Sequence, residues 1–267
     1  MADAVLGRPV WAELLTKDMK AAETFYTTVV GWTVAPFEGS PDPYDMWMRA
    51  SDAPIGGVMP IPQGMNYPPH WNFYVAVPNL DNAITQIERL GGKGLSEIIQ
   101  VPNVGRMRAM LDPQGAMFSI LEPAPSSSSQ PDTKPTLGDV SWYELYTTDA
   151  EAAKKFYQAI FGWRETETMD MGPMGKYHMF GRQSTMGGMM NKPKEIAHVP
   201  NHWLLYFNVP DVHAASERVK AQGGQVLNTM EVPGGDWIAQ CIDPQGAAFA
   251  IHQFKERHSL KVEGGSI

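Results

Sequence analysis

The chain has little cysteine, no long apolar run and no recognisable leader segment. Cys241 is the single cysteine among 267 residues, which excludes an intrachain disulfide and a zinc cluster built on cysteines. No run of about 18 apolar residues occurs, and residues 1–11 lack the basic region and apolar stretch of a signal peptide. These absences predict a cytoplasmic protein with no membrane partner.

Basic residues and common catalytic motifs are also scarce. There are 21 Lys and Arg against 29 Asp and Glu, a net charge of −8, so no nucleic-acid partner is expected. The sequence has no Gly-rich phosphate loop, no HExxH pattern and no Ser or Cys nucleophile motif. It does have 17 Met and 10% aromatic residues, which suit a soft apolar pocket. The expected partner is a small organic molecule.

The sequence repeats itself after 131 residues. Matches run through both halves: Trp11 and Trp142, Glu13 and Glu144, Gly56 and Gly187, Asp112 and Asp243. In a middle stretch the spacing is 132, which indicates a one-residue insertion in a loop. Residues 1–123 and 138–256 are therefore predicted to be two copies of one domain. A Pro/Ser-rich linker, 124–137, joins them, and 257–267 form a polar tail.

Each half contains the same order of elements twice. The first half begins with a strand at 10–15 and a helix that starts at the N-cap Asp18 and ends at Gly31. Short strands follow, including 45–49, and a second unit opens with a strand at 71–77 and a helix at 80–90. The second half matches, with a helix between Asp149 and Gly162, a predicted Glu151–Lys155 pair, and a strand at 177–180. Each half is thus two βαβββ units.

The paired units resemble the vicinal oxygen chelate superfamily, which includes glyoxalase I, bleomycin resistance proteins and extradiol dioxygenases. The resemblance is carried by the Phe25-Tyr26 to Gly31-Trp32 helix end and by the turn Asp112 to Gly115, each present in both halves. It implies an α+β fold in which each half curls into an open, cup-shaped mixed sheet with flanking helices. It also implies a site in the cup, which in many members holds a divalent metal ion.

The positions that the resemblance assigns to metal ligands carry poor donors. They are Trp11, Asn72 and Ser119 in the first half, and Trp142, Leu204 and Ala250 in the second. Divalent ions prefer carboxylate, imidazole or thiolate donors, so neither a metal nor another cofactor is expected. Positions two residues further along each strand share its face. They are Glu13, Tyr74 and Leu121, and in the second half Glu144, Tyr206 and His252. With His178, the second trio keeps a metal-dependent lyase or dioxygenase as the alternative.

Glu13 and Glu144 are the most informative residues, because a strand carboxylate among apolar residues needs a partner. Each either organises the sheet or contacts a ligand, and Glu144 and His252 are the candidate catalytic residues if the protein is an enzyme, with or without metal. The preferred hypothesis is metal-free binding of a small molecule in one or both cups. Its predicted ligand contacts are Trp11, Glu13, Asn72, Tyr74, Trp142, Glu144, His178, Tyr206 and His252.

Three further interpretations remain open at this stage. His70 and His202 follow Pro-containing loops, which favours turn hydrogen bonds over chemistry. Arg106 and Arg108 share one strand face, which is either solvated or a fork for an anion. The linker permits the halves to pair within one chain or in a homodimer.

Overall fold

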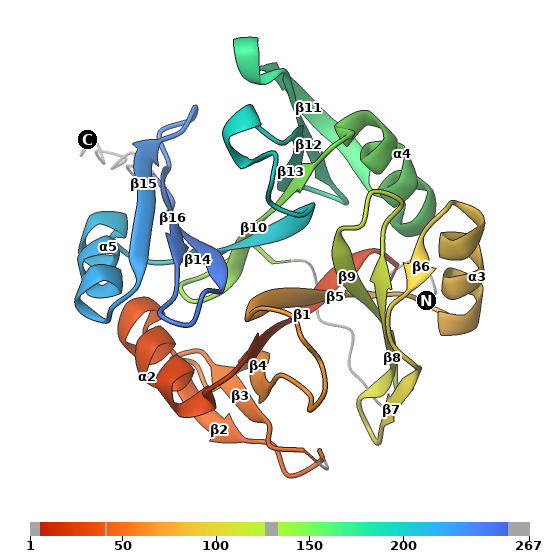
Figure 1. Ribbon diagram of the computed structural model, residues 1–267, viewed down its shortest axis with the longest axis horizontal. Helices are drawn as coiled ribbons and strands as arrows, with labels where there is room; N and C mark the ends of the chain where they lie inside the picture. The colour runs from red at the N-terminus through yellow and green to blue at the C-terminus, as the bar shows by residue number, and fades with distance from the viewer. Residues whose placement is uncertain (1–5, 41, 126–132, 256–267) are drawn as a thin grey trace, which may run out of the picture.

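The structure, a computed structural model, describes residues 6–40, 42–125 and 133–255. Within these ranges the chain forms two mixed sheets and four α-helices (Figure 1). Residues 126–132 of the predicted linker and the whole predicted tail lie outside them. No helix in the described ranges is long and apolar enough to span a membrane.

The first half is one curled sheet made from two units. The first unit contains β1 (Arg8–Thr16), α2 (Met19–Val30), β2 (Thr33–Pro36), β3 (Asp45–Met48) and β4 (Pro54–Pro60). The second contains β5 (His70–Ala76), α3 (Leu80–Arg89), β6 (Lys93–Gly94), β7 (Ile99–Val101), β8 (Gly105–Leu111) and β9 (Met117–Pro123). Strand order is β2-β3-β4-β1-β5-β9-β8-β6, with β7 paired to β8. The antiparallel pair β1–β5 joins the two units.

The second half repeats this plan. Its first unit contains β10 (Val140–Thr147), α4 (Ala150–Phe161), β11 (Arg164–Asp170), β12 (Lys176–Gly181) and β13 (Thr185–Asn191), with short 3-10 turns η1 (Gly172–Met174) and η2 (Lys194–Ile196). Its second contains β14 (His202–Asn208), α5 (Val212–Ala221), β15 (Gln225–Glu231), β16 (Trp237–Ile242) and β17 (Ala248–Gln253). The order β11-β12-β13-β10-β14-β17-β16-β15 confirms the duplicated α+β fold, with each sheet curled into a half-barrel (Figure 1).

The first helix of each half begins and ends where the sequence predicts. The side chain of Asp18 accepts a hydrogen bond from the backbone N–H of Ala21, and Asp149 caps α4 in the same way. Gly31 and Gly162 end these helices at φ values of 90° and 66°, which favour glycine. The predicted Glu151–Lys155 pair is wrong, because Glu151 instead pairs with Lys154 at 3.0 Å, one residue closer along the helix.

One hydrophobic core serves both halves, because alternate residues of the central strands point toward the opposite half. Trp71 and Phe73 of β5 contact Phe207 and Trp203 of β14, respectively. We call the sheet face that lines this core the outer face, and the opposite one the inner face. The inner face of each sheet is where the predicted site residues of β1, β5, β10 and β14 lie.

The repeated Phe-Tyr and Asp-Pro-Gln-Gly motifs bind the two halves together. The Tyr26 hydroxyl, on α2, donates to Asp243 of the second half at 3.1 Å and accepts from Trp71 Nε1 at 2.9 Å. The mirror set joins Tyr157 to Asp112 at 3.0 Å, with Trp203 as its donor. Each half therefore inserts its first helix into the turn of the other. The motifs that carry the resemblance belong to this interface and not to the inner faces.

Candidate functional site

A buried glutamate on the inner face of the first half is held between two tyrosines. Glu13 is 7% exposed; its Oε1 accepts a hydrogen bond from Tyr44 at 2.9 Å and its Oε2 one from Tyr74 at 2.7 Å. Trp11 Nε1 donates to the Tyr44 hydroxyl at 2.7 Å. Burial raises the pKa of Glu13, and the two hydroxyl groups offset only part of that rise. The predicted residues Trp11, Glu13 and Tyr74 do meet.

The second half builds the same arrangement. Glu144, 6% exposed, accepts from Tyr177 at 2.8 Å and from Tyr206 at 2.5 Å. Trp142 Nε1 donates to the Tyr177 hydroxyl at 2.8 Å. We call this Tyr-Glu-Tyr set, with its tryptophan, the clamp of each half. In both clamps the phenols donate to the carboxylate, and the hydroxyl oxygen of Tyr44 or Tyr177 also accepts from the tryptophan.

The glycine pairs of β4 and β13 make room for the clamps. A Cβ on Gly57 would lie 2.2 Å from the Tyr44 hydroxyl, and one on Gly188 would lie 2.1 Å from the Tyr177 ring. Both distances are far below a carbon contact of about 3.5 Å. A glycine is therefore needed beneath each tyrosine, which explains why this residue recurs.

Sequence analysis did not single out Tyr44 or Tyr177. They lie 133 residues apart, whereas the glycines they cover lie 131 apart, because the stretch between Gly162 and Tyr177 is two residues longer than its counterpart in the first half and the β12–β13 turn is two residues shorter. The register slip hides the match. A search for tyrosines two residues before the strand residue opposite Gly57 and Gly188 would have found both.

Beside the clamp, the first half carries a polar pair that the second half lacks. Asn72 lies opposite Glu13 in the β1–β5 register, and its Nδ2 donates to Ser119 Oγ at 2.7 Å. The hydrogen bond of Ser119 to the Tyr74 hydroxyl lowers the pKa of that tyrosine, but burial and Glu13 raise it more. The Oδ1 atom of Asn72 is buried and has no hydrogen-bond partner. Asn72 thus presents an unused acceptor on the inner face.

In the second half, Gln240 covers the clamp. Its Nε2 donates to the hydroxyls of Tyr146 at 2.7 Å and Tyr206 at 3.1 Å, and lies 3.3 Å from Glu144. Its Oε1 accepts from Asn228 at 2.9 Å. A small hydrophobic cluster surrounds these groups: Leu204, Tyr206 and Ala250, with Trp142, Tyr146 and Ile238 packed against them. Gln240 and Tyr146 were not predicted, because they have no polar counterparts in the first half.

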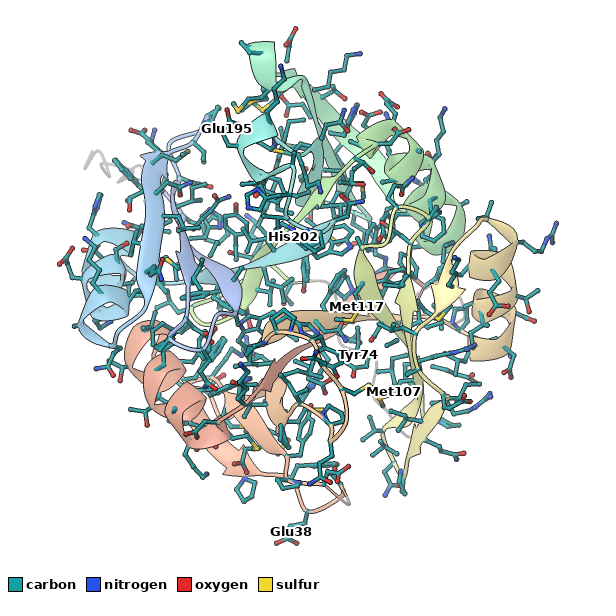
Figure 2. The ribbon with its side chains drawn as sticks, viewed as in Figure 1. Glu38, Tyr74, Met107, Met117, Glu195 and His202 are labelled. Atoms are coloured by element: carbon teal, nitrogen blue, oxygen red, sulfur yellow. The ribbon has the colours of Figure 1, made fainter. Side chains whose placement is uncertain are left out.

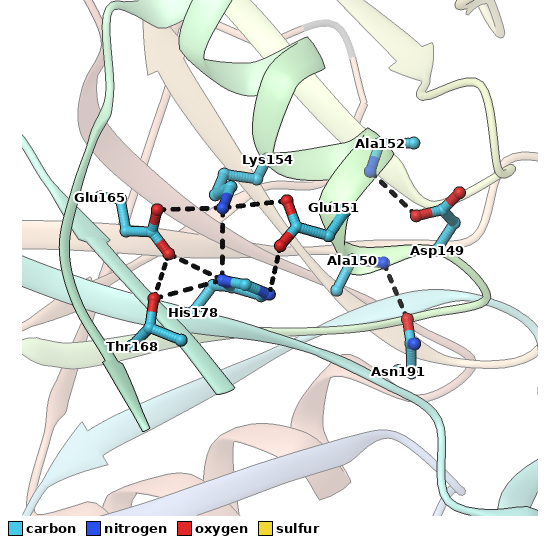
Figure 3. Close-up of polar contacts among 9 residues, drawn as sticks. All are labelled: Asp149, Ala150, Glu151, Ala152, Lys154, Glu165, Thr168, His178 and Asn191. Carbon is cyan, nitrogen blue, oxygen red and sulfur yellow. Dashed lines mark hydrogen bonds and ion pairs between the residues drawn. The ribbon is translucent and has the colours of Figure 1, made fainter. Parts of the chain in front are cut away.

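The structure contradicts the expected place of His178. Tyr177 occupies the inner face of β12, so His178 points the other way, toward α4 (Figure 3). There its Nδ1 lies 2.7 Å from Glu165 and its Nε2 3.3 Å from Glu151, with Lys154 beside it. Burial works to raise the pKa of Glu165, but hydrogen bonds from Thr168, His178 and Lys154 lower it to about 2. His178 belongs to this outer ion-pair cluster and not to a cup.

His252 is also engaged elsewhere. Its Nδ1 lies 2.8 Å from Ser141 Oγ, at the irregularity of β10, and its Nε2 lies 3.2 Å from Asp236. Burial lowers the pKa of His252, and the bond to Asp236 offsets part of that effect. Both ring nitrogens are therefore already in use, and the predicted trio of Glu144, Tyr206 and His252 does not assemble around one point.

Hydrogen bonds and ion pairs decide the interpretations of His70, His202, Arg106 and Arg108. The ring nitrogens of His70 and His202 lie 2.9 and 2.8 Å from the carbonyl oxygens of Pro68 and Pro200, so the predicted turn bonds are confirmed. Arg106 pairs with Asp81 and Glu122, and Arg108 binds the Ser96 carbonyl and lies 3.7 Å from Glu88. These arginines are therefore not an anion fork on the inner face.

A surface pocket of about 340 Å³ lies at the loop that connects β4 to β5. Thr16 and Lys17 line one side, and the other is formed by 60–67, which includes Tyr67. Burial and, to a smaller extent, the charge of Glu13 raise the pKa of Tyr67. In the equivalent loop of the second half, Lys192 Nζ binds the carbonyl oxygens of Ala197 and Val199, which fastens the loop.

Comparison with known proteins decides the family. The Glyoxalase/Bleomycin resistance protein/Dioxygenase superfamily model matches residues 139–251, and a Glyoxalase-like domain model matches 11–121. "Putative glyoxylase CFP32" of Mycobacterium bovis is 31% identical over 92% of this chain and 94% of its own length. The chain belongs to this superfamily. The resemblance inferred from the paired units is thereby confirmed.

Three further proteins are similar to this chain over almost its whole length. "Anthracycline biosynthesis protein DauV" of Streptomyces sp. strain C5 is 28% identical over 97% of this chain and 98% of its own length. Among solved structures, the Mn(II)-bound glyoxalase from Novosphingobium aromaticivorans superposes with a TM-score of 0.65 at 14% identity, covering 94% of this chain and 83% of that one. Homoprotocatechuate 2,3-dioxygenase from Brevibacterium fuscum gives 0.66 at 15%, covering 98% and 84%. At such identities the structures show a shared fold.

The metal ion that the superfamily implies does not fit the residues of this chain. Among the described residues, no group of three His, Cys, Asp or Glu side chains is arranged to hold a metal ion. Each clamp offers one carboxylate, and both of its oxygens already accept tyrosine hydroxyls. A divalent ion there would have to displace these bonds and would find phenol, indole and amide neighbours.

Proposed function

We propose that the protein binds a small planar organic molecule on the inner face of a half-barrel without a metal ion. The observation that carries this proposal is the clamp, in which a buried glutamate fixes two tyrosines. Fixed aromatic rings provide large apolar contact area at low entropic cost, which suits a flat ligand. The glutamate acts here as the anchor of the binding wall.

Methionines contribute the flexible side chains of the proposed binding surface. Met107 on β8 and Met117 on β9 lie on the inner face beside Tyr74 of β5, on three neighbouring strands (Figure 2). Both are partly exposed. Methionine side chains are flexible and polarizable, so they can shift to fit ligands of different outline. Rigid aromatic rings next to flexible methionines favour binding of aromatic compounds as a class.

A relative supports the same ligand class. DauV, similar to this chain over nearly its whole length, is named as an anthracycline biosynthesis protein. Anthracyclines are planar polycyclic compounds, so planar phenols, naphthols and quinones are the class to test first.

The test is thermal unfolding of the wild-type chain with a panel of planar phenols, naphthols and anthraquinones. A ligand at 100 times its Kd raises the free energy of unfolding by about 2.7 kcal/mol, which is a clear rise in Tm. We expect at least one such compound to raise Tm of the wild type and less so of Glu13→Gln/Glu144→Gln. The surface variant Lys20→Ala is the control and should respond like the wild type. If no compound changes Tm, the proposal is wrong.

A further inference from the structure

The two inner faces share a clamp but differ in what surrounds it. Four positions exchange polar for apolar residues between the halves: Asn72 and Leu204, Ser119 and Ala250, Ala109 and Gln240, Leu15 and Tyr146. In the first half the polar pair lies on β5 and β9. In the second half the polar residues lie on β10 and β16. The same fold therefore presents two different surfaces, and they are not equally suited to a ligand.

The second inner face is already satisfied. The amide nitrogen of Gln240 donates to Tyr206 of the clamp and to Tyr146, and its oxygen accepts from Asn228. Leu204 and Ala250 fill the space at the positions of Asn72 and Ser119. A ligand entering here would have to break these bonds and would gain no new ones. This half resembles a site closed by its own side chains.

The first inner face still has a hydrogen-bond acceptor that no protein group uses. Ala109 stands at the position of Gln240, so the amide that bonds to the second clamp has no counterpart on β8. The Asn72 side chain, 5% exposed in total, keeps its Oδ1 without a partner, and a buried acceptor in that state is unfavourable until a donor reaches it. The neighbouring Met107 and Met117 are partly exposed, and methionine side chains are flexible enough to adjust to a ligand.

The charge of the first inner face selects against anions. Both Glu13 oxygens are bonded to neutral phenols, and no cation offsets the charge of Glu13 within its hydrogen bonds. Tyr44 already accepts from Trp11 Nε1, and Tyr74 is hydrogen-bonded to Ser119, whereas Asn72 Oδ1 is an acceptor without a partner. A carboxylate or phosphate would lie close to the buried Glu13 carboxylate, whereas an O–H or N–H group would find the unused acceptor of Asn72.

We propose that the ligand site is the inner face of the first half, and that Asn72 Oδ1 accepts a hydrogen bond from an O–H or N–H group of a neutral planar ligand. This inference rests on the proposed function. It adds which half holds the ligand, which group of the ligand donates a hydrogen bond, and that Asn72 accepts it. Ser119 holds the Asn72 amide in position, and the second half completes the interface and the core.

The experiment measures binding of three matched probes by isothermal titration calorimetry: 2-naphthol, 2-methoxynaphthalene and 2-naphthoate. They differ only in having a donor, lacking one, or carrying a negative charge. We expect 2-naphthol to bind at one site per chain, about 10-fold or more tighter than 2-methoxynaphthalene, and 2-naphthoate to bind weakest. The variants are taken from the other half of the chain, so that each substituted residue is known to fit its position.

Asn72→Leu introduces the residue of the second half. It should remove the preference for 2-naphthol over 2-methoxynaphthalene while the affinity for the latter changes by about twofold or less. Gln240→Ala introduces the residue of the first half and should leave the first site unchanged. Unfolding of each variant by urea confirms that it is folded.

The outcomes separate the two proposals. If 2-naphthol binds but Asn72→Leu leaves its preference intact, or if Gln240→Ala weakens it, the assignment to the first half is overturned while the proposed function stands. Equal affinity for 2-naphthol and 2-methoxynaphthalene, or tightest binding of 2-naphthoate, overturns the proposal that the site prefers a neutral ligand with a hydrogen-bond donor. Failure of 2-naphthol alone overturns the ligand class proposed here, whereas failure of the entire thermal panel overturns the proposed function itself.

Discussion

The contact between the halves gives a sharp prediction, because a single hydroxyl group serves both sides of it. Tyr26→Phe removes the hydroxyl that donates to Asp243 and accepts from Trp71 Nε1. The ring remains, and with it the packing against Trp71 and Phe249. The change therefore tests hydrogen bonding alone, at a place where Tyr26 is fully buried.

The magnitude follows from the two bonds. Losing a bond to a carboxylate costs about 1.5 to 3 kcal/mol, and leaving the Trp71 N–H buried without an acceptor costs about 1 to 3 kcal/mol. Burying a phenylalanine in place of a tyrosine returns part of this, because no hydroxyl must be desolvated. We expect a net loss of about 2 to 4 kcal/mol in the free energy of unfolding.

Urea unfolding followed by fluorescence measures this loss directly. Tyr157→Phe removes the equivalent hydroxyl and should cost a similar amount, whereas Tyr67→Phe, in a partly exposed loop, should cost less than about 0.5 kcal/mol. The shared core predicts one transition for the whole chain in every variant. Losses below about 0.5 kcal/mol at both interface tyrosines would refute the role assigned to them.

Three other substitutions test the clamp and the outer cluster. Because burial raises the pKa of Glu13 above its value of 4.5 in an unfolded chain, the stability of the wild type relative to Glu13→Gln should fall as pH rises from about 4.5 through the folded pKa and then level off; a difference independent of pH would contradict the burial argument. The pKa of Glu165 is lowered to about 2, so the advantage of the wild type over Glu165→Gln should be present above about pH 4.5 and be lost as pH falls through about 2, as followed by urea unfolding at each pH. Gly57→Ala should destabilise the chain by about 1 to 3 kcal/mol, and by much less when Tyr44 is also replaced by alanine; a double-mutant cycle with no coupling would show that the two residues do not compete for space.

Much of the fold could be predicted because it is recorded twice. The duplicated pairs of Trp, Glu, Gly and Asp gave the two-unit halves, and the N-caps and glycine ends gave the first helices. Local signals suffice for such features, because capping and turn formation depend on a few adjacent residues. The function of the Phe-Tyr and Asp-Pro-Gln-Gly motifs could not be read in this way, because Tyr26 and Asp243 lie 217 residues apart.

The candidate site was predictable only in part. Strand alternation correctly placed Trp11, Glu13 and Tyr74 on one face, since successive residues of a strand point to opposite sides. The prediction for His178 was wrong because Tyr177, and not His178, faces the inner side of β12. The repeat did not reveal Tyr177, because its spacing from Tyr44 is two residues longer than the spacing between the glycines of the two halves. Gln240 was not predicted because its counterpart in the first half is Ala109, so a comparison of the two halves does not mark it.

Binding of 2-naphthol in the absence of metal is the decisive measurement for a metal-free site. The wild-type chain is treated with EDTA, desalted and titrated with 2-naphthol, and the titration is repeated after incubation with Mn²⁺, Fe²⁺ or Zn²⁺ and a second desalting. We expect the same Kd in all titrations and retained metal far below one ion per chain. Near-stoichiometric retention of a metal, with binding that requires it and is lost in Glu144→Gln, would contradict metal-free binding and place a metal site in the second half.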